Sequence, residues 1–106
     1  MSQAVTFMEN RTLLDGDTKT ASMDLGAGRQ FGIHIRVLKD GTAGTITFEH
    51  SAVDEDAAFE PFGTARALNA TGNYPEIIDG YLRYVRVVAS SVEGGPVVSA
   101  YGIAKE

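Results

Sequence analysis

The chain has no cysteine and no tryptophan, and it has only two histidines and three prolines. The lack of cysteine excludes disulfides, thiolate metal sites and cysteine nucleophiles. No apolar run approaches the roughly 20 residues that a membrane-spanning helix needs, and the first ten residues lack the basic start and apolar stretch of a secretory signal. We therefore expect a protein that is made in the cytoplasm and has no membrane partner.

Positive charge is also scarce. Nine lysines and arginines face 14 aspartates and glutamates, which gives a net charge of -5, and the basic residues are scattered along the chain. A nucleic-acid binder usually gathers its basic residues into one patch, so no nucleic-acid partner is expected. With 106 residues, 43% of them hydrophobic, the chain is the size of one soluble domain with one core.

Apolar residues alternate with small or polar ones in two successive runs. Ile35 and Val37 belong to the first run, Ile46 and Phe48 to the second, and turn residues fill positions 40–43 between them. This period of two is typical of half-buried strands. Pairing Val37 with Ile46 and Ile35 with Phe48 puts both apolar sets on one face, so the pattern predicts a hairpin in this register.

The C-terminal part repeats the pattern. Residues 81–89 are rich in β-branched and aromatic side chains, residues 93–96 read Glu-Gly-Gly-Pro, and residues 97–104 form a last apolar run. These features predict a second hairpin. In the stretch YLRYVRVV both alternating sets are partly apolar, so we expect one face in the core and the other covered by a loop or another subunit.

Regular turn signals and the absence of a helical period predict an all-β fold. We expect a single-domain antiparallel β-sandwich over residues 1–106, jelly-roll-like or of related Greek-key type, with six to eight strands and little or no helix. Residues 1–20 are either an extended N-terminal arm or the first strand of this sandwich. The sequence leaves both open.

No motif points to catalysis or to a cofactor. The glycines of residues 24–32 miss the spacing of a nucleotide-binding loop, and no helical pattern follows them. The acidic groups at 15–17 and 54–56 lack the further spaced ligands of a calcium loop. His34, expected opposite a glutamate of the next strand, and His50 have neither a cysteine nor a nucleophile motif to work with. We expect no enzyme, no metal and no cofactor.

Three segments resemble the capsid cement, or head decoration, proteins of tailed bacteriophages. They are MDLGAGRQFGIHIRV, FEPFGTARAL and GYLRYVRVVASSVEGGPVVSAYGIA, within residues 20–104. The shared features are an early Asp-Leu-Gly, a late Tyr-Leu-Arg strand, a Gly-Gly turn and a final strand of small residues. The resemblance implies a jelly-roll protein on the exterior of the virion capsid, where it stabilises contacts between subunits of the major capsid protein.

On this hypothesis the partners are the major capsid protein and other copies of the chain, as a homo-oligomer such as a dimer or trimer. An N-terminal arm could add as a strand to a neighbour. The alternatives are a glycan-binding β-sandwich module and a head or tail fibre adhesin component. Candidate contact residues for the capsid or for another subunit are Val5, Phe7, Met8, Phe59, Phe62, Tyr74, Tyr81 and Arg83.

Overall fold

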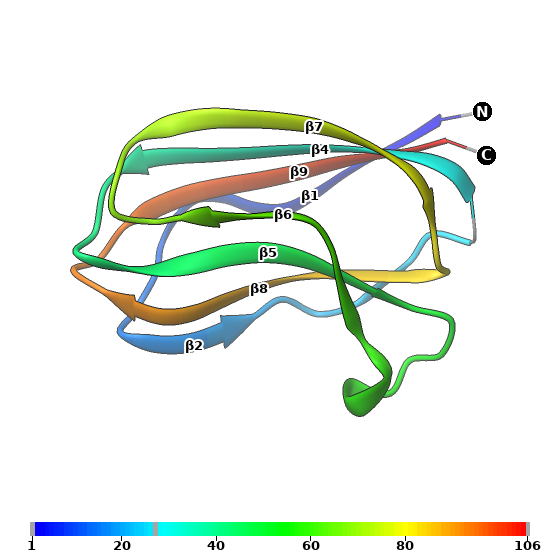
Figure 1. Cartoon of the computed structure of the whole chain (residues 1–106), viewed down its shortest axis with the longest axis horizontal. Helices are drawn as coiled ribbons and strands as arrows, with labels where there is room; N and C mark the ends of the chain where they lie inside the picture. Colours follow the sequence, from blue (N-terminus) through cyan, green and yellow to red (C-terminus); the bar gives the residue numbers. More distant parts are fainter. Residues whose placement is uncertain (1, 27, 106) are drawn as a thin grey trace.

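Two antiparallel sheets face each other in a computed structural model that describes residues 2–26 and 28–105. One sheet has the strand order β1-β9-β4-β7, and the other has the order β2-β8-β5-β6 with β3 also beside β8 (Figure 1). The strands within these residues are β1 (Ser2–Thr12), β2 (Gly16–Lys19), β3 (Met23–Asp24), β4 (Gly28–Lys39), β5 (Ala43–Ser51), β6 (Glu60–Ala67), β7 (Gly72–Tyr81), β8 (Tyr84–Glu93) and β9 (Val97–Lys105).

The strand order is that of a jelly roll. β2 and β3 both pair with β8, so they act as two pieces of one interrupted strand. Apart from that break, only β5 and β6 are joined within one sheet, and every other connection passes from one sheet to the other. Two Greek keys wound in this way make the eight-stranded jelly roll. The predicted all-β sandwich is therefore confirmed.

The prediction of a hairpin between the runs at 31–39 and 43–50 is wrong. β4 pairs with β7 and β9, whereas β5 pairs with β6 and β8, so the two strands lie in different sheets. His34 consequently lies between Pro75 and Tyr101, and Glu49 lies beside Arg86. Both apolar sets do enter the core, but they meet across the space between the sheets, about 10 Å wide.

The second predicted hairpin is wrong for the same reason. β8 belongs to the β2-β8-β5-β6 sheet and β9 to the β1-β9-β4-β7 sheet. The Gly94-Gly95 turn, in which both residues have positive φ, joins the sheets instead of two neighbouring strands. An alternating pattern determines which side chains point inward. It does not determine whether two such strands pair within one sheet or lie in opposite sheets, because their apolar side chains enter the core in both arrangements.

Residues 2–12 form a strand of this sandwich. β1 pairs antiparallel with β9, from Ser2 beside Lys105 to Thr12 beside Val97. The register shifts on both sides of Met8, as in β-bulges, and both Phe7 and Met8 are buried. The sequence leaves open an extended N-terminal arm or a first strand of the sandwich, and in the structure residues 2–12 are the first strand. Both ends of the chain lie at the same end of the sandwich (Figure 1).

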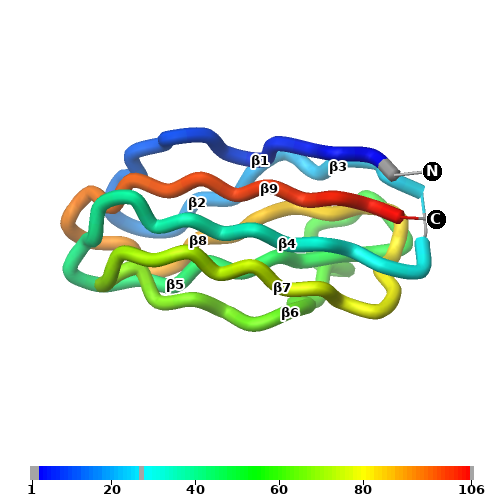
Figure 2. The backbone as a smooth tube through the Cα atoms, turned by 90° about the horizontal axis from the view of Figure 1, so that it is seen from above, coloured from blue at the N-terminus to red at the C-terminus, as the bar shows by residue number. Residues whose placement is uncertain are grey.

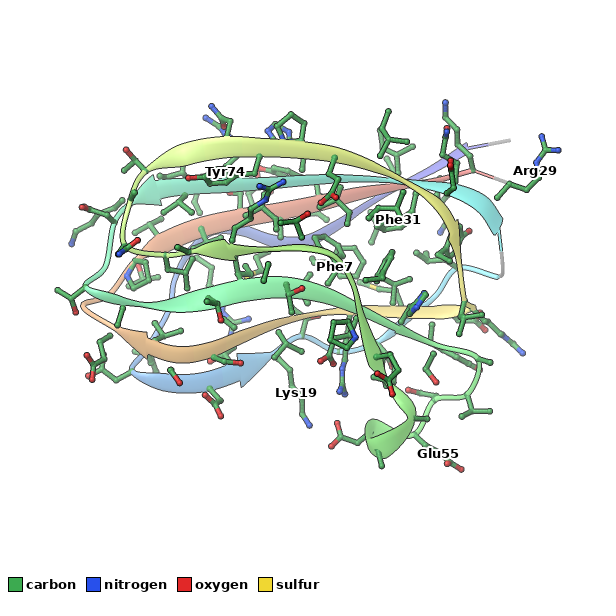
Figure 3. The ribbon with its side chains drawn as sticks, in the orientation of Figure 1. Phe7, Lys19, Arg29, Phe31, Glu55 and Tyr74 are labelled. Atoms are coloured by element: carbon green, nitrogen blue, oxygen red, sulfur yellow. The ribbon has the colours of Figure 1, made fainter. Side chains whose placement is uncertain are left out.

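Phe31 of β4 is the centre of the core. Its side chain is fully buried, and its ring centroid lies 5.8 Å from that of Phe48, 5.5 Å from that of Phe62 and 5.3 Å from that of Tyr81. Gly102 on the neighbouring strand β9 leaves room for it, because a Cβ atom there would lie 2.4 Å from Phe31 Cζ. The core is thus built around aromatic rings contributed by both sheets (Figure 3).

Helix is almost absent from residues 2–26 and 28–105. The one helical segment described is a 3₁₀ turn, η1 (Asp56–Ala58), in the connection between β5 and β6. Within this part of the chain no helix has the length and apolar character needed to cross a membrane.

Candidate interaction surface

The outer face of the β1-β9-β4-β7 sheet carries a row of apolar residues that runs across the strands. The register places Ala4 of β1 beside Ile103 of β9, Ile103 beside Gly32 of β4, and Gly32 beside Ile77 of β7. We call these four residues the apolar strip. Figure 2 shows the four strands β1, β9, β4 and β7 side by side. Within the strip, Ile77 is 71% exposed and Ile103 is 47% exposed.

A second row lies directly beside the strip. The same register aligns Thr6 of β1, Tyr101 of β9, His34 of β4 and Pro75 of β7. We call these residues the ring row, because three of them carry rings. The ring centroids of His34 and Tyr101 are 6.2 Å apart, and both side chains are half-buried. The ring row therefore borders the strip on one side.

The strip is recessed at Gly32, which has no side chain. A Cβ atom at this position would come no closer than 3.8 Å to Ile103, so the space above the glycine is open. A shallow groove of about 360 Å³ lies there, between Ile77 and Ile103 and against His34 and Tyr101. Exposed apolar residues are usually scattered singly, whereas Ile77 and Ile103 line one recess across neighbouring strands, which makes this face a candidate interaction surface.

Charged groups lie beyond the two rows at opposite ends of the face. Past the ring row, Arg36 Nε donates a hydrogen bond of 2.9 Å to Asn73 Oδ1 of β7. Past the strip, Asp79 of β7 and Lys105 of β9 flank Gln30 of β4. The end past the ring row therefore carries one positive charge, and the end past the strip carries one charge of each sign.

Five of the predicted contact residues are buried in the folded chain. They are Phe7, Met8, Phe59, Phe62 and Tyr81, none of which is more than 9% exposed. Figure 3 shows Phe7 inside the sandwich, beside Phe31. Phe7, Met8, Phe62 and Tyr81 belong to the core, and Phe59 lies against the guanidinium of Arg86. Burial within the folded chain already uses the apolar area of all five side chains.

The other three predicted residues have different surroundings. Val5 is half-buried and packs against the core, and Tyr74 is half-buried below the guanidinium of Arg66, 5.1 Å from the ring centroid. Arg83 is exposed and binds Asp24 through two hydrogen bonds of 2.9 and 2.7 Å. The structure does not bring the eight residues together into one patch.

The residues of the apolar strip are not among the contact residues predicted from the sequence. Ile77 occurs in the run Asn73-Tyr74-Pro75-Glu76-Ile77-Ile78, in which the side chains of odd-numbered residues point outward. Ile103 likewise falls in the outward phase of β9. An isoleucine at a position that faces solvent in a strand can indicate an interaction surface. Ile77 and Ile103 nevertheless look like isolated residues in the sequence, because only the sheet order places β7, β4 and β9 side by side.

Polar side chains dominate the outer face of the other sheet. Arg86 of β8 is 12% exposed and donates hydrogen bonds of 2.8 Å to Glu49 and 2.5 Å to Asp56, while its guanidinium lies 4.0 Å from the ring centroid of Phe59. Burial by itself lowers the pKa of Arg86, but its hydrogen bonds to Asp56 and Glu49 outweigh that effect and raise it. Lys19 also binds Asp56, at 2.5 Å. This cluster attaches the η1 connection to the sheet.

The acidic groups considered as calcium ligands have partners within the protein. Asp17 accepts a hydrogen bond of 2.8 Å from the backbone N–H of Ser91, and Asp54 accepts one of 2.6 Å from Ser22. The hydrogen bond from Lys19 holds the pKa of Asp56 below its usual range, and the one from Arg86 adds to this. In residues 2–26 and 28–105 no three His, Asp or Glu side chains converge as a metal site would require.

His50 is placed to respond to pH. Its Nδ1 accepts a hydrogen bond of 3.1 Å from the backbone N–H of Leu82, and its ring stacks on Phe62 with centroids 4.4 Å apart. Burial lowers the pKa of His50, and the charge of nearby Glu60 opposes this only in part. The folded protein therefore favours the neutral imidazole, which keeps Nδ1 free to accept.

We expect His50 to make the fold less stable in mild acid. Because the folded pKa lies below that of an unfolded histidine, about 6.5, the unfolded chain binds the proton first as pH falls. The stabilisation is complete above about pH 6.5 and is lost as pH falls from there through the folded pKa. Urea unfolding at several pH values would measure this loss, which should be smaller in His50→Gln. Parallel pH profiles for the two proteins would contradict the assignment.

No protein-family model matches the chain, and no curated protein matches it. Solved structures do share its fold. The SPBc2 prophage-derived protein YomS superposes with a TM-score of 0.62 at 19% identity, over 98% of this chain and 92% of that one. PirA superposes with a TM-score of 0.51 at 16% identity, over 99% of this chain and 93% of that one. The similarity covers the whole sandwich, and at these identities it shows a common fold.

A carbohydrate-binding module, CsCBM6-3 from Clostridium stercorarium, was solved in complex with cellobiose and overlaps less closely. Its TM-score is 0.39 at 19% identity, over 97% of this chain and 74% of that one. An overlap of this extent carries no argument about ligands.

Proposed function

We propose that the chain is a structural protein of a phage or prophage that binds the exterior of an assembled capsid and stabilises the contacts between its major capsid subunits. The observation that carries the proposal is the apolar strip with its recess at Gly32, held rigid across the four strands of one sheet. A surface of this kind acts by contact and needs no reacting group. The fold shared with a prophage-derived protein supports the same origin.

The physical mechanism is linkage. A protein that binds the assembled shell but not the free subunit stabilises the shell by mass action, by an amount that grows with its concentration. Copies that are joined to one another bind more tightly, because each first contact raises the effective concentration for the next. A small rigid sandwich suits this task because little conformational entropy remains to be lost on binding.

Co-sedimentation with capsid shells tests the proposal. We expect the purified chain to pellet with shells assembled from the major capsid protein of the same genome and to raise their melting temperature. Ile77→Asp should weaken shell binding by about tenfold or more, because it removes an apolar contact and places an unpaired charge in the interface. Leu14→Asp is the matched control, since Leu14 is equally exposed, at 77% against 71%, but lies in a loop outside the strip.

Two results would contradict the proposal. Failure of the wild-type chain to bind shells at micromolar concentration is one, and equal effects of the two aspartate substitutions is the other. Binding to a glycan array in the absence of any shell would favour the alternative of a glycan-binding module or a fibre adhesin component.

A further inference from the structure

The basic side chains of the chain fall into two groups. Those of the first group are ion-paired with acids and lie in the β2-β8-β5-β6 sheet or directly beside it: Lys19, Arg66, Arg83 and Arg86. Those of the second group make no ion pair with any residue of 2–26 and 28–105, and all lie on strands of the β1-β9-β4-β7 sheet: Arg11, Arg29, Arg36, Lys39 and Lys105. The unpaired cations are therefore confined to the sheet that carries the apolar strip.

The acidic residues are distributed the other way. Among the described residues, the four strands of this sheet carry five basic and three acidic residues, whereas the rest carries four basic and ten acidic ones. Counting Asp40, which follows β4 directly, changes the first balance only to five against four. In a chain with a net charge of -5, this sheet is thus the side that repels an acidic partner least.

The recess at Gly32 is lined by an unpaired cation. Lys105 of β9 is exposed and borders the groove together with Ile103. Glu76, the acid among the described residues that line the groove, already has partners: its Oε1 accepts a hydrogen bond of 2.9 Å from the N–H of Thr64 and lies 3.7 Å from Nη2 of Arg66, and its Oε2 accepts one of 3.0 Å from the Thr64 hydroxyl. A partner that covers Lys105 without offering a carboxylate would bury an unpaired charge, which is costly.

Arg36 lies on the other side of the recess. Its Nε donates to the uncharged side chain of Asn73, and the guanidinium has no acidic partner in the part of the chain that the structure describes. Along β4 it lies four residues from Gly32, about 13 Å, and the position beside Lys105 lies two residues away in the opposite direction, about 7 Å. A surface that covers the recess therefore meets a cation on both sides, and Asp79 is the single acid in these rows.

The apolar centre of this face favours protein over nucleic acid. A phosphate backbone is bound by a continuous row of basic groups, whereas here the strip separates Arg36 from Lys105. Phosphates and sugars also offer no apolar group for the recess between Ile77 and Ile103. An apolar core with charged groups around it is the usual arrangement of a protein–protein interface.

We infer that the capsid surface that covers the apolar strip is acidic: one large apolar side chain fills the recess at Gly32, and carboxylates beside it pair with Lys105 and Arg36. The inference deepens the proposed function and rests on it, because it names the chemistry of the surface that the strip contacts. Complementary charge of this kind speeds association and fixes the orientation of the bound protein.

A polymer experiment tests the inference without a shell. The probe is a random copolymer of glutamate and tyrosine, which offers carboxylates and large apolar side chains together. Although the chain is itself acidic, we expect it to bind this copolymer at low ionic strength, and more tightly than polyglutamate, which has no apolar side chain. Lys105→Gln and Arg36→Gln should each weaken binding by about threefold, as expected for an exposed charge pair, and added salt should reduce the difference.

Lys19→Gln is the matched control for charge. It changes the net charge by the same amount, but Lys19 belongs to β2 in the other sheet, and Figure 3 shows its side chain pointing away from the four-stranded sheet. Copolymer binding should be unchanged by this substitution. The inference is overturned if the wild-type chain does not bind the copolymer, if Lys19→Gln weakens binding as much as Lys105→Gln, or if duplex DNA binds as tightly as the copolymer.

Two substitutions at one position repeat the test on capsid shells. Ile77→Asp and Ile77→Lys both remove the apolar contact and add a charge, but only the aspartate is repelled by an acidic surface. Ile77→Lys should therefore bind shells about threefold more tightly than Ile77→Asp, or better. If shells bind the wild-type chain and the two variants lose equally, the proposed function stands and the acidic partner fails. Charge-dependent binding of the copolymer without binding to shells would support an acidic occupant of the strip and contradict the proposed function.

Discussion

Phe31→Ala should lower the free energy of unfolding by about 3–5 kcal/mol, which is the usual cost of removing a buried phenylalanine ring. The residue is fully buried and its ring contacts those of Phe48, Phe62 and Tyr81. Phe48 and Phe62 belong to the opposite sheet, so the cavity would open between the two sheets. Neither sheet could move in to fill the cavity without distorting the hydrogen bonds between its own strands. A domain of this size has only about 5–15 kcal/mol of stability, so the variant should lose a large share of it.

Urea unfolding followed by far-ultraviolet circular dichroism measures the effect. Ile77→Ala is the control, because it removes a large apolar side chain that is 71% exposed and should change stability by no more than about 0.5 kcal/mol. Should Phe31→Ala cost less than about 1 kcal/mol, Phe31 would not be the centre of a tightly packed core.

Arg86→Ala should destabilise the fold by about 2 kcal/mol, because it leaves Glu49 with a charge that is only partly solvated. The side chains of Arg86 and Glu49 are 12% and 17% exposed, and their hydrogen bond is 2.8 Å long. The substitution also removes the cation above Phe59 and the hydrogen bond that attaches η1 at Asp56. We expect faster hydrogen exchange in the connection between β5 and β6 as well as a lower urea midpoint.

Arg83 is a matched control for the effect of burial on the Arg86 ion pair. This arginine also binds a carboxylate, that of Asp24, through two hydrogen bonds, and it also lies over a ring, that of Tyr84, at 5.1 Å. Its side chain is 55% exposed and that of Asp24 is 45% exposed. Solvent screens such a pair, so Arg83→Ala should cost much less than Arg86→Ala. Equal losses from the two substitutions would show that burial is not what distinguishes them.

The strand content can be predicted from short-range patterns. Alternation of Ile35 and Val37 with polar neighbours locates β4, and the run around Val85 and Val87 locates β8, because an inward face must be apolar in every strand that covers the core. The middle strands are less visible. β7 contains Pro75, a feature of an edge strand, and its outward residues include the apolar Ile77, so its alternation is weak.

The predicted contact residues show where sequence reasoning fails. Phe7, Phe62 and Tyr81 are attractive candidates because aromatic residues are frequent at interfaces, but the same property makes them the best core residues. Ile77 and Ile103 do not stand out in the sequence because each is an ordinary strand residue on its own. The distinction between core and surface depends on which face of which sheet a residue occupies.

Periodicity, turn residues and length are enough to predict an all-β sandwich with one core, because they act locally and each strand shows its own inward face. Which strands are neighbours depends on how the whole chain packs, and local patterns do not encode it. The turns at residues 41 and 94–95 carry the chain from one sheet to the other. The same glycines would suit a hairpin within one sheet, so the turn residues do not distinguish the two kinds of connection. The apolar strip depends on the strand order, because its four residues come from four strands and are joined only by lateral pairing.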